Sequence, residues 1–136
     1  MVLGKTIEAG LLLAQKWAER RRRLLVIVPA NLRKQWAQGL ADKFYLPWVI
    51  LEARSFNAAV RAGNLNPFAQ DAIVVCSYQF ARSKEPYLRQ TAWDFIVIDE
   101  AHRLRDVYEG SSKIAPAIKQ AVAPFRRVLV FDNRYM

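Results

Sequence analysis

Four short apolar runs, none interrupted by a charged residue, most constrain what this chain can fold into. They are Leu24–Val28, Ala72–Cys76, Phe95–Ile98 and Val128–Phe131. Each has the length of a strand, and a continuous apolar pattern is typical of strands that are covered on both faces. Segments with helical spacing lie between these runs. The alternation predicts βαβ units, and therefore an α/β fold with a mostly parallel sheet flanked by helices.

The connecting segments supply the expected helices and turns. A first helix should open at Gly4-Lys5-Thr6 and end near Arg20–Arg23, whose charges complement its dipole. Asn31 is expected to cap a second helix that reaches about Lys43. Its buried stripe should comprise Leu32, Trp36 and Leu40. The other expected elements are a strand at 48–51, a helix around 56–61, a turn at 63–67, a helical region interrupted at Pro86, and a helix at about 113–122 capped after the loop 110–112.

Composition narrows the class of partner. A hydrophobic content of 53% is ample for the core of one domain, here 1–136. The net charge of +9 favours an anionic partner, nucleic acid before membrane, although surplus arginines could simply solvate the surface.

Cys76 lies in an apolar run and can form no intrachain disulfide, which suits a reducing compartment. Glu8 interrupts the opening segment, so we expect no signal peptide and an intracellular, non-secreted protein.

The run Phe95–Ile98 ends in two adjacent carboxylates, Asp99 and Glu100. Open α/β sheets bind ligands at the carboxyl ends of their strands, and paired acids there suit a metal ion and a proton acceptor. Gly4-Lys5-Thr6 at a helix start suits a phosphate, because free N–H groups and a lysine attract the anion and a threonine hydroxyl can ligate magnesium. Each signal is weak alone. Together, in this order, they favour a magnesium–phosphate site.

Four ordered motifs resemble those of Swi/Snf-type helicase-like ATPases of superfamily two. Residues 4–11 are similar to the exit of the phosphate loop, residues 25–36 to motif Ia, residues 74–78 to motif Ib, and Asp99-Glu100-Ala101-His102 to the D-E-A-H box of motif II. The resemblance covers nearly the whole chain. It implies the first RecA-like lobe of a motor that hydrolyses ATP to translocate on double-stranded DNA, in the cytoplasm at the nucleoid or in a nucleus.

The resemblance also implies roles at the nucleotide. Gly4, Lys5 and Thr6 would bind ATP, with Lys5 on the β and γ phosphates and Thr6 on Mg²⁺. Asp99 would hold the same Mg²⁺, usually through water, and Glu100 would polarise the hydrolytic water. His102 would couple the nucleotide state to the DNA-contacting elements. Without the flanking acids, a histidine hydrogen-bonded in a loop would be the default interpretation of His102.

Roles at the nucleic acid follow from the same comparison. The residues implied to lie against the DNA backbone are Pro29, Ala30, Ser77 and Tyr78. Contacts of this kind position a protein without reading base sequence. The tryptophans Trp36, Trp48 and Trp93 are predicted to be core or edge packing rather than base-stacking platforms.

The chain departs from the family pattern at both ends. Val2 stands where the family has the glycine two places before Gly4, and the strand that feeds the phosphate loop is not in this sequence. That strand would pair beside Val128–Phe131, leaving an open edge. Residues 131–136 replace a serine-alanine-threonine motif, and the second RecA-like lobe would be a partner. We therefore expect a partial ATP-binding domain without turnover of its own. A non-catalytic basic DNA-binding module and a non-functional remnant stay open as alternatives.

Overall fold

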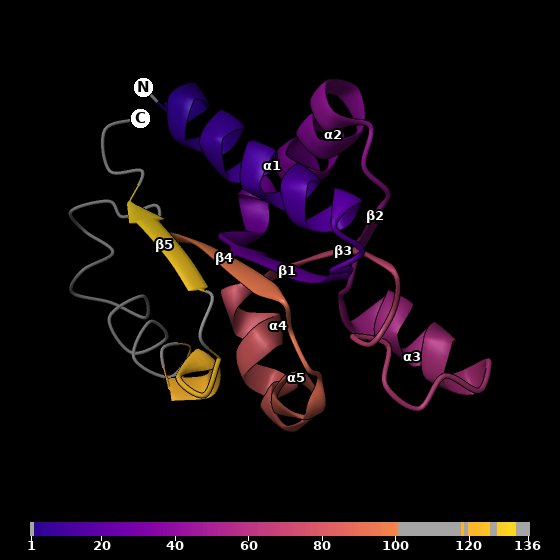
Figure 1. Cartoon of the computed structure of the whole chain (residues 1–136). Helices are drawn as coiled ribbons and strands as arrows, with labels where there is room; N and C mark the ends of the chain where they lie inside the picture. Colours follow the sequence, from indigo (N-terminus) through magenta and orange to yellow (C-terminus); the bar gives the residue numbers. More distant parts are fainter. Residues whose placement is uncertain (1, 101–117, 119, 126–127, 133–136) are drawn as a thin grey trace.

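The computed structural model describes residues 2–100, 118, 120–125 and 128–132, and this part of the chain contains one sheet of five parallel strands (Figure 1). The strands are β1 (Arg23–Val28), β2 (Trp48–Ile50), β3 (Ala72–Ser77), β4 (Phe95–Glu100) and β5 (Val128–Asp132), in the spatial order β2-β3-β1-β4-β5. The helices are α1 (Val2–Ala18), α2 (Arg33–Phe44), α3 (Ala53–Arg61), α4 (Tyr78–Ser83) and α5 (Glu85–Gln90), and residues 118 and 120–122 are also helical. The predicted fold class is confirmed.

Helices cover both faces of the sheet, as the apolar runs require (Figure 1). Successive strand residues point to opposite faces, so each run divides between two cores. Leu24 and Val26 of β1 pack in the cluster that contains buried residues of α1 and α2. Leu25 and Ile27 pack in the other cluster, with buried residues of α3, α4 and α5. A strand with this double burial has no position for a polar side chain before its end.

Burial confirms the packing prediction for Trp36 and Trp93. Trp36 is 4% exposed and lies in the core between α2 and the sheet, and Trp93 is 8% exposed in the opposite core. Trp48 begins the edge strand β2 and is 43% exposed.

The start of α2 differs from the prediction. Asn31 is exposed and lies in a 3₁₀ turn, Ala30–Leu32, and the cap residue of α2 is Leu32, with no side-chain hydrogen bond. A backbone carbonyl takes the place of the expected side-chain acceptor: the N–H of Arg33 donates to the carbonyl of Ala30. The 3₁₀ turn thus uses the amides that Asn31 was expected to satisfy, and the prediction of an asparagine cap was wrong.

Other local predictions are confirmed with shifted boundaries. The turn at 63–67 is present, with Gly63 at a φ of 101° and the Asn66 side chain accepting the N–H of Phe68 at 3.1 Å. The helix α3 starts at Ala53, earlier than predicted. The break in the helical region falls at Lys84, so that Pro86 occupies the first turn of α5, where its missing N–H costs nothing. The predicted cap at 110–112 and the start of the helix that follows it lie outside the described residues.

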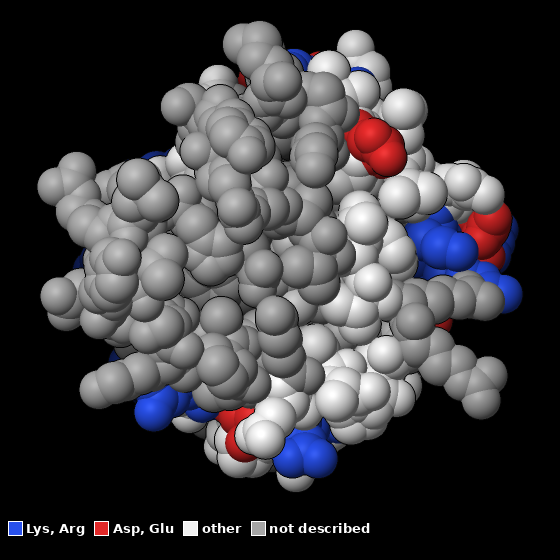
Figure 2. Space-filling view, turned by 90° about the vertical axis from the view of Figure 1, so that its left-hand side faces the viewer, with Lys and Arg blue, Asp and Glu red and all other residues white. Residues whose placement is uncertain are grey.

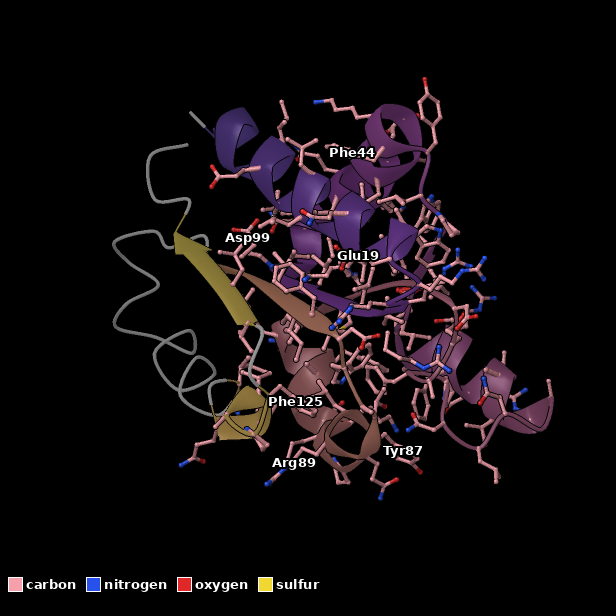
Figure 3. All side chains as sticks on the ribbon, in the orientation of Figure 1. Glu19, Phe44, Tyr87, Arg89, Asp99 and Phe125 are labelled. Atoms are coloured by element: carbon pink, nitrogen blue, oxygen red, sulfur yellow. The ribbon has the colours of Figure 1, made fainter. Side chains whose placement is uncertain are left out.

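The helices α1 and α2 meet at a close contact between Gly10 and the ring of Phe44. A Cβ atom on Gly10 would lie 2.2 Å from Cε2 of Phe44, far inside van der Waals contact. Figure 3 shows Phe44 between the two helices. A methyl group at Gly10 would therefore force the Phe44 ring to shift.

Gly10→Ala should destabilise the chain, although alanine is the better helix former. Overpacking typically costs about 1 to 3 kcal/mol, against a gain of about 1 kcal/mol from helix propensity. In a Phe44→Ala background the clash is gone, and Gly10→Ala should then be stabilising by up to about 1 kcal/mol. Urea denaturation of the four proteins measures this cycle. An effect of the same sign and size in both backgrounds would contradict the contact.

The thiol of Cys76 is wholly buried in β3, as its sequence environment predicts. Burial raises the pKa of this thiol from 9.0 to about 12, and the nearby charge of Arg33 opposes the rise only in part. In the unfolded chain the thiol ionises near its ordinary pKa, while the native thiol stays neutral. The unfolded state therefore binds fewer protons at alkaline pH, and the contribution of Cys76 to stability is lost as the pH rises from about 9 to about 12.

This pH dependence should disappear in Cys76→Ala. Between about pH 8 and pH 10.5, the free energy of unfolding of the unsubstituted chain should fall by about 2 kcal/mol more than that of the variant. Denaturation curves at a series of pH values measure the difference. Other groups titrate alike in both proteins, so parallel pH profiles would show that Cys76 ionises equally in the folded and unfolded states.

Candidate active site at the carboxyl edge of the sheet

The register of the sheet brings the predicted strand-end residues into one row. Val28 of β1 pairs with Ser77 of β3, and Asp99 of β4 pairs with Phe131 of β5. Between them, Ile27 pairs with Ile98, one position before Val28 and Asp99. Because all five strands are parallel, these positions lie at the same edge. The fold thus assembles segments that are far apart in the sequence, as expected at a strand-end ligand site.

Asp99 is the buried acid of this row, with 0% of its surface exposed. It lies on the face of the sheet that α1 and α2 cover (Figure 3). The indole Nε1–H of Trp36 donates a hydrogen bond of 3.0 Å to Oδ2 of Asp99. The hydroxyl of Tyr78 donates to the main-chain carbonyl oxygen of Asp99. Two other elements, α2 and the start of α4, therefore hold this one residue.

The structure describes other predicted nucleotide residues through their backbone. Gly4, Lys5 and Thr6 are helical as predicted, but α1 begins at Val2 rather than at Gly4, so they lie within its first turns. The helix α1 contacts β4, so the elements that carry the two halves of the predicted site are neighbours. Glu100 is the last residue of β4 and pairs with Asp132 of β5. His102 lies outside the described residues.

The four residues predicted to lie along DNA occupy the ends of β1 and β3. Pro29 is half-buried, and Ala30 is exposed at the start of the 3₁₀ turn. Ser77 is 7% exposed, and its hydroxyl accepts the N–H of Phe80 at 3.1 Å, capping α4. Tyr78 is half-buried because its hydroxyl reaches Asp99. Among these four, Ala30 is the position most open to solvent.

The acid at the end of β4 suits a magnesium ion held together with phosphates. Mg²⁺ prefers oxygen ligands and usually takes one or two carboxylates, with waters and phosphate oxygens completing its shell. The described residues contain no cluster of three or more His, Cys, Asp or Glu side chains that could hold a metal alone. Asp99 is such a carboxylate, on a strand that contacts α1, the helix bearing Lys5 and Thr6. This fits a mode of binding in which the nucleotide brings the other oxygens.

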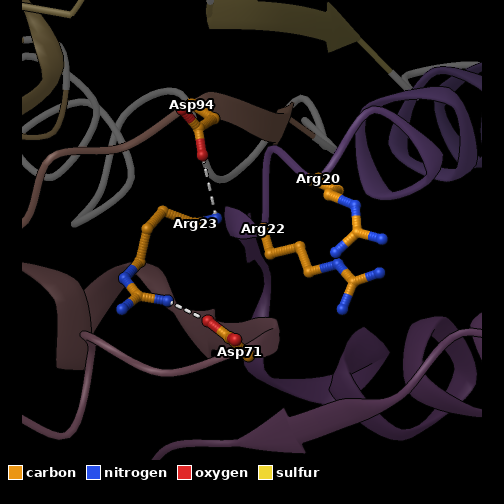
Figure 4. Close-up of a pocket in the computed structure, with 5 residues that line it drawn as sticks. All are labelled: Arg20, Arg22, Arg23, Asp71 and Asp94. Carbon is orange, nitrogen blue, oxygen red and sulfur yellow. Dashed lines mark hydrogen bonds and ion pairs between the residues drawn. The ribbon is translucent and has the colours of Figure 1, made fainter.

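A separate hollow of about 360 Å³ lies at the opposite edge of the sheet (Figure 4). It is lined by Arg20, Arg22, Arg23, Asp71 and Asp94, which stand at the end of α1 or beside the starts of β1, β3 and β4. Arg23 forms an ion pair with Asp71, and its N–H donates to the Asp94 carboxylate at 3.1 Å. The contacts of Arg23 therefore join the starts of β1, β3 and β4. The hollow lies at the edge of the sheet opposite to Asp99.

Some described cations are paired with acids, whereas Arg20, Arg22 and Arg23 gather at the hollow. The ion pairs of the described chain join Lys16 and Arg21 to Glu19, Arg23 to Asp71, Arg33 to Glu52, and Arg89 to Glu85. On the face drawn in Figure 2, blue and red side chains lie close to one another at its margin.

No described helix combines the length and the apolar character needed to cross a membrane.

Comparison with known proteins identifies the family of this chain. Residues 1–130 match the SNF2-related domain. The chain belongs to this family. The RNA polymerase-associated protein RapA of Yersinia enterocolitica is 34% identical over 132 residues, and the RapA of Yersinia pseudotuberculosis is 35% identical over the same length. Each alignment covers 94% of this chain but 14% of the relative, so the chain spans about a seventh of the length of these proteins.

The fold agrees with this family membership. The crystal structure of the UvsW helicase from bacteriophage T4 superposes with a TM-score of 0.64 over 96% of this chain and 43% of the helicase chain, at 13% sequence identity. At that identity the likeness shows the fold alone. The resemblance to Swi/Snf-type proteins that the motifs indicated is confirmed, and with it the RecA-like sheet of the SNF2-related domain.

Sequence reasoning missed the role of Trp36 at the site. We predicted packing, and the residue is indeed buried, but its N–H also reaches Asp99. The two residues are 63 positions apart, so no local spacing connects them. The available signal was the place of Trp36 in the segment that resembles motif Ia.

Proposed function

We propose that this SNF2-related chain is part of the nucleotide-binding lobe of a motor that hydrolyses ATP, with Mg²⁺, to move along double-stranded DNA. The observation that carries the proposal is the meeting of three motif segments at Asp99. Trp36 follows the segment at the end of β1, and Tyr78 follows β3; both donate hydrogen bonds to Asp99 in the D-E-A-H sequence. Such an arrangement suits an enzyme in which ATP hydrolysis is coupled to contacts with DNA.

In this proposal, each nucleotide-site residue has one task. Backbone N–H groups at the start of α1 and the ammonium of Lys5 would attract the phosphates, and the Thr6 hydroxyl and the Asp99 carboxylate would hold Mg²⁺. Mg²⁺ supplies neutralisation of the charge that develops on the phosphate oxygens. Glu100 orients and polarises the attacking water, and His102 transmits the nucleotide state to the DNA-facing segments. A second RecA-like lobe would supply the groups across the cleft.

The DNA-facing part of the proposal rests on Pro29, Ala30, Ser77 and Tyr78. Their segments lie side by side at the ends of β1 and β3, where they could follow a phosphate backbone without reading bases. The net charge of +9 favours such a partner. The name of the relatives points the same way, since RapA is RNA polymerase-associated. A protein with these partners would work inside the cell, at the nucleoid or in a nucleus.

Hydrolysis can be tested in a chimera, in which this chain replaces the matching segment of a full-length RapA from Yersinia. We expect DNA-stimulated ATP hydrolysis that requires Mg²⁺. Lys5→Ala and Glu100→Gln should each lower kcat by about 100-fold or more, because they remove phosphate neutralisation and water activation. The measurement is phosphate release with and without duplex DNA.

Lys43→Ala and Glu85→Gln are the matched controls, since they remove the same charges from the surface of α2 and α5. Both should keep the hydrolysis rate of the unsubstituted chimera. A folded chimera whose hydrolysis is unchanged by Lys5→Ala and Glu100→Gln would contradict the proposed function.

DNA contact at the strand ends can be tested in the 136-residue chain itself. Ala30→Glu puts a negative charge at the exposed end of β1 and should weaken binding to a fluorescent DNA duplex about fivefold or more at low salt, by repulsion from phosphates. Ala62→Glu makes the same change at the exposed end of α3. It should have a much smaller effect.

The same titration separates the motor from a basic binding module. A module that works through its net charge alone would lose equal affinity in Ala30→Glu and Ala62→Glu, and a nucleotide analogue would not alter its binding. An equal loss in both variants would therefore contradict a DNA site at the strand ends.

A further inference from the structure

Asp99 is held at two chemically different points. The indole of Trp36 donates to carboxylate oxygen Oδ2 at 3.0 Å, and the hydroxyl of Tyr78 donates to the main-chain oxygen. Trp36 is 4% exposed and Asp99 is 0% exposed, so water competes little for the indole bond. The bond from Trp36 restricts the orientation of the carboxylate. The bond from Tyr78 holds the main chain at the end of β4.

The two donors come from the two segments proposed to face DNA. Trp36 lies in α2, which follows Pro29, Ala30 and the 3₁₀ turn after β1. Tyr78 is the first residue of α4, directly after Ser77. Each segment is short and is continuous with a helix that packs on the sheet. A displacement at either strand end would therefore move a donor relative to Asp99.

The chemistry of the indole makes Trp36 a suitable anchor. An indole N–H can only donate a hydrogen bond, whereas a hydroxyl can both donate and accept. Groups that hydrogen-bond to a metal ligand fix its direction and tune its affinity for the metal. The bond from Trp36 restricts rotation of the Asp99 carboxylate about its side-chain torsions.

We propose that Trp36 and Tyr78 are positioning residues, which orient Asp99 for Mg²⁺ and couple it to the two strand-end segments that face DNA. Trp36 fixes the carboxylate, and Tyr78 fixes the carbonyl at the end of β4. The metal-binding geometry then depends on where α2 and α4 lie. This inference rests on the proposed function for the role of the metal, whereas the hydrogen-bonded arrangement can be tested without it.

Trp93 provides a matched comparison within the same chain. Its indole N–H also donates a buried hydrogen bond, at 2.9 Å, but the acceptor is the carbonyl of Leu88. Trp93 is 8% exposed and lies in the core on the other face of the sheet. A substitution to phenylalanine therefore removes the same group at both sites, and only Trp36→Phe removes a bond to the acid.

The first experiment is NMR spectroscopy of the indole N–H groups in the 136-residue chain, assigned with Trp→Phe variants. The Trp36 signal should exchange slowly with water, and Asp99→Asn should shift it while leaving the Trp93 signal in place. Exposed Trp48 gives the reference for fast exchange. Exchange of Trp36 as fast as that of Trp48, or an unshifted Trp36 signal in Asp99→Asn, would overturn the arrangement.

The second experiment uses the RapA chimera and measures the Mg²⁺ concentration that gives half-maximal hydrolysis. Trp36→Phe should raise it about tenfold, and Tyr78→Phe should raise it in the same direction. Trp93→Phe should leave it unchanged, even if its melting temperature falls as much as that of Trp36→Phe. Equal Mg²⁺ requirements in Trp36→Phe and Trp93→Phe would overturn the positioning role.

The two failures can be told apart. If the proposed function is wrong, Lys5→Ala will not reduce hydrolysis by the chimera. If only the positioning inference fails, hydrolysis will still depend on Lys5, but Trp36→Phe will not change the Mg²⁺ concentration for half-maximal hydrolysis. The NMR experiment would show the same failure if the Trp36 signal gave no sign of a bond to Asp99. The NMR result stands on its own, because it needs neither nucleotide nor turnover.

Discussion

The hydrogen bond from Trp36 to Asp99 joins a helix on one face of the sheet to the acid at the end of a central strand. A carboxylate withdrawn from water needs donors or cations around it, and removing one partner of such a bond leaves the other poorly solvated. The indole can meet that need only if α2 lies close to the end of β4. The position of the helix and the orientation of the acid are therefore set together.

That bond is possible because the rest of the sheet is apolar. β1, β3 and β4 are buried on both faces, and their side chains divide between two cores. Polar groups are thereby displaced to the strand ends. At one edge they are Ser77, Asp99 and Glu100, and at the other they include Asp71 and Asp94. At the strand starts the acids bond Arg23, and at the other edge Asp99 accepts hydrogen bonds from Trp36 and Tyr78.

The strands and the fold class could be predicted because continuous apolar runs have few other solutions. Local details were less predictable. Asn31 is a good capping residue, but a 3₁₀ turn after Pro29 supplied backbone acceptors first. Ser77 was expected at DNA, and the structure shows that its hydroxyl also caps α4. The acceptor that an amide finds depends on the path of the backbone as well as on the residue type.

The sequence by itself determined the order of the motifs, the double burial of the strands and the presence of two acids at a strand end. These features depend on residue type and spacing along the chain, which the sequence states directly. Only the tertiary structure decided that Trp36 and Tyr78 bond Asp99, because those contacts join residues 63 and 21 positions apart. Such contacts depend on strand order and on how each helix packs. Neither follows from local periodicity.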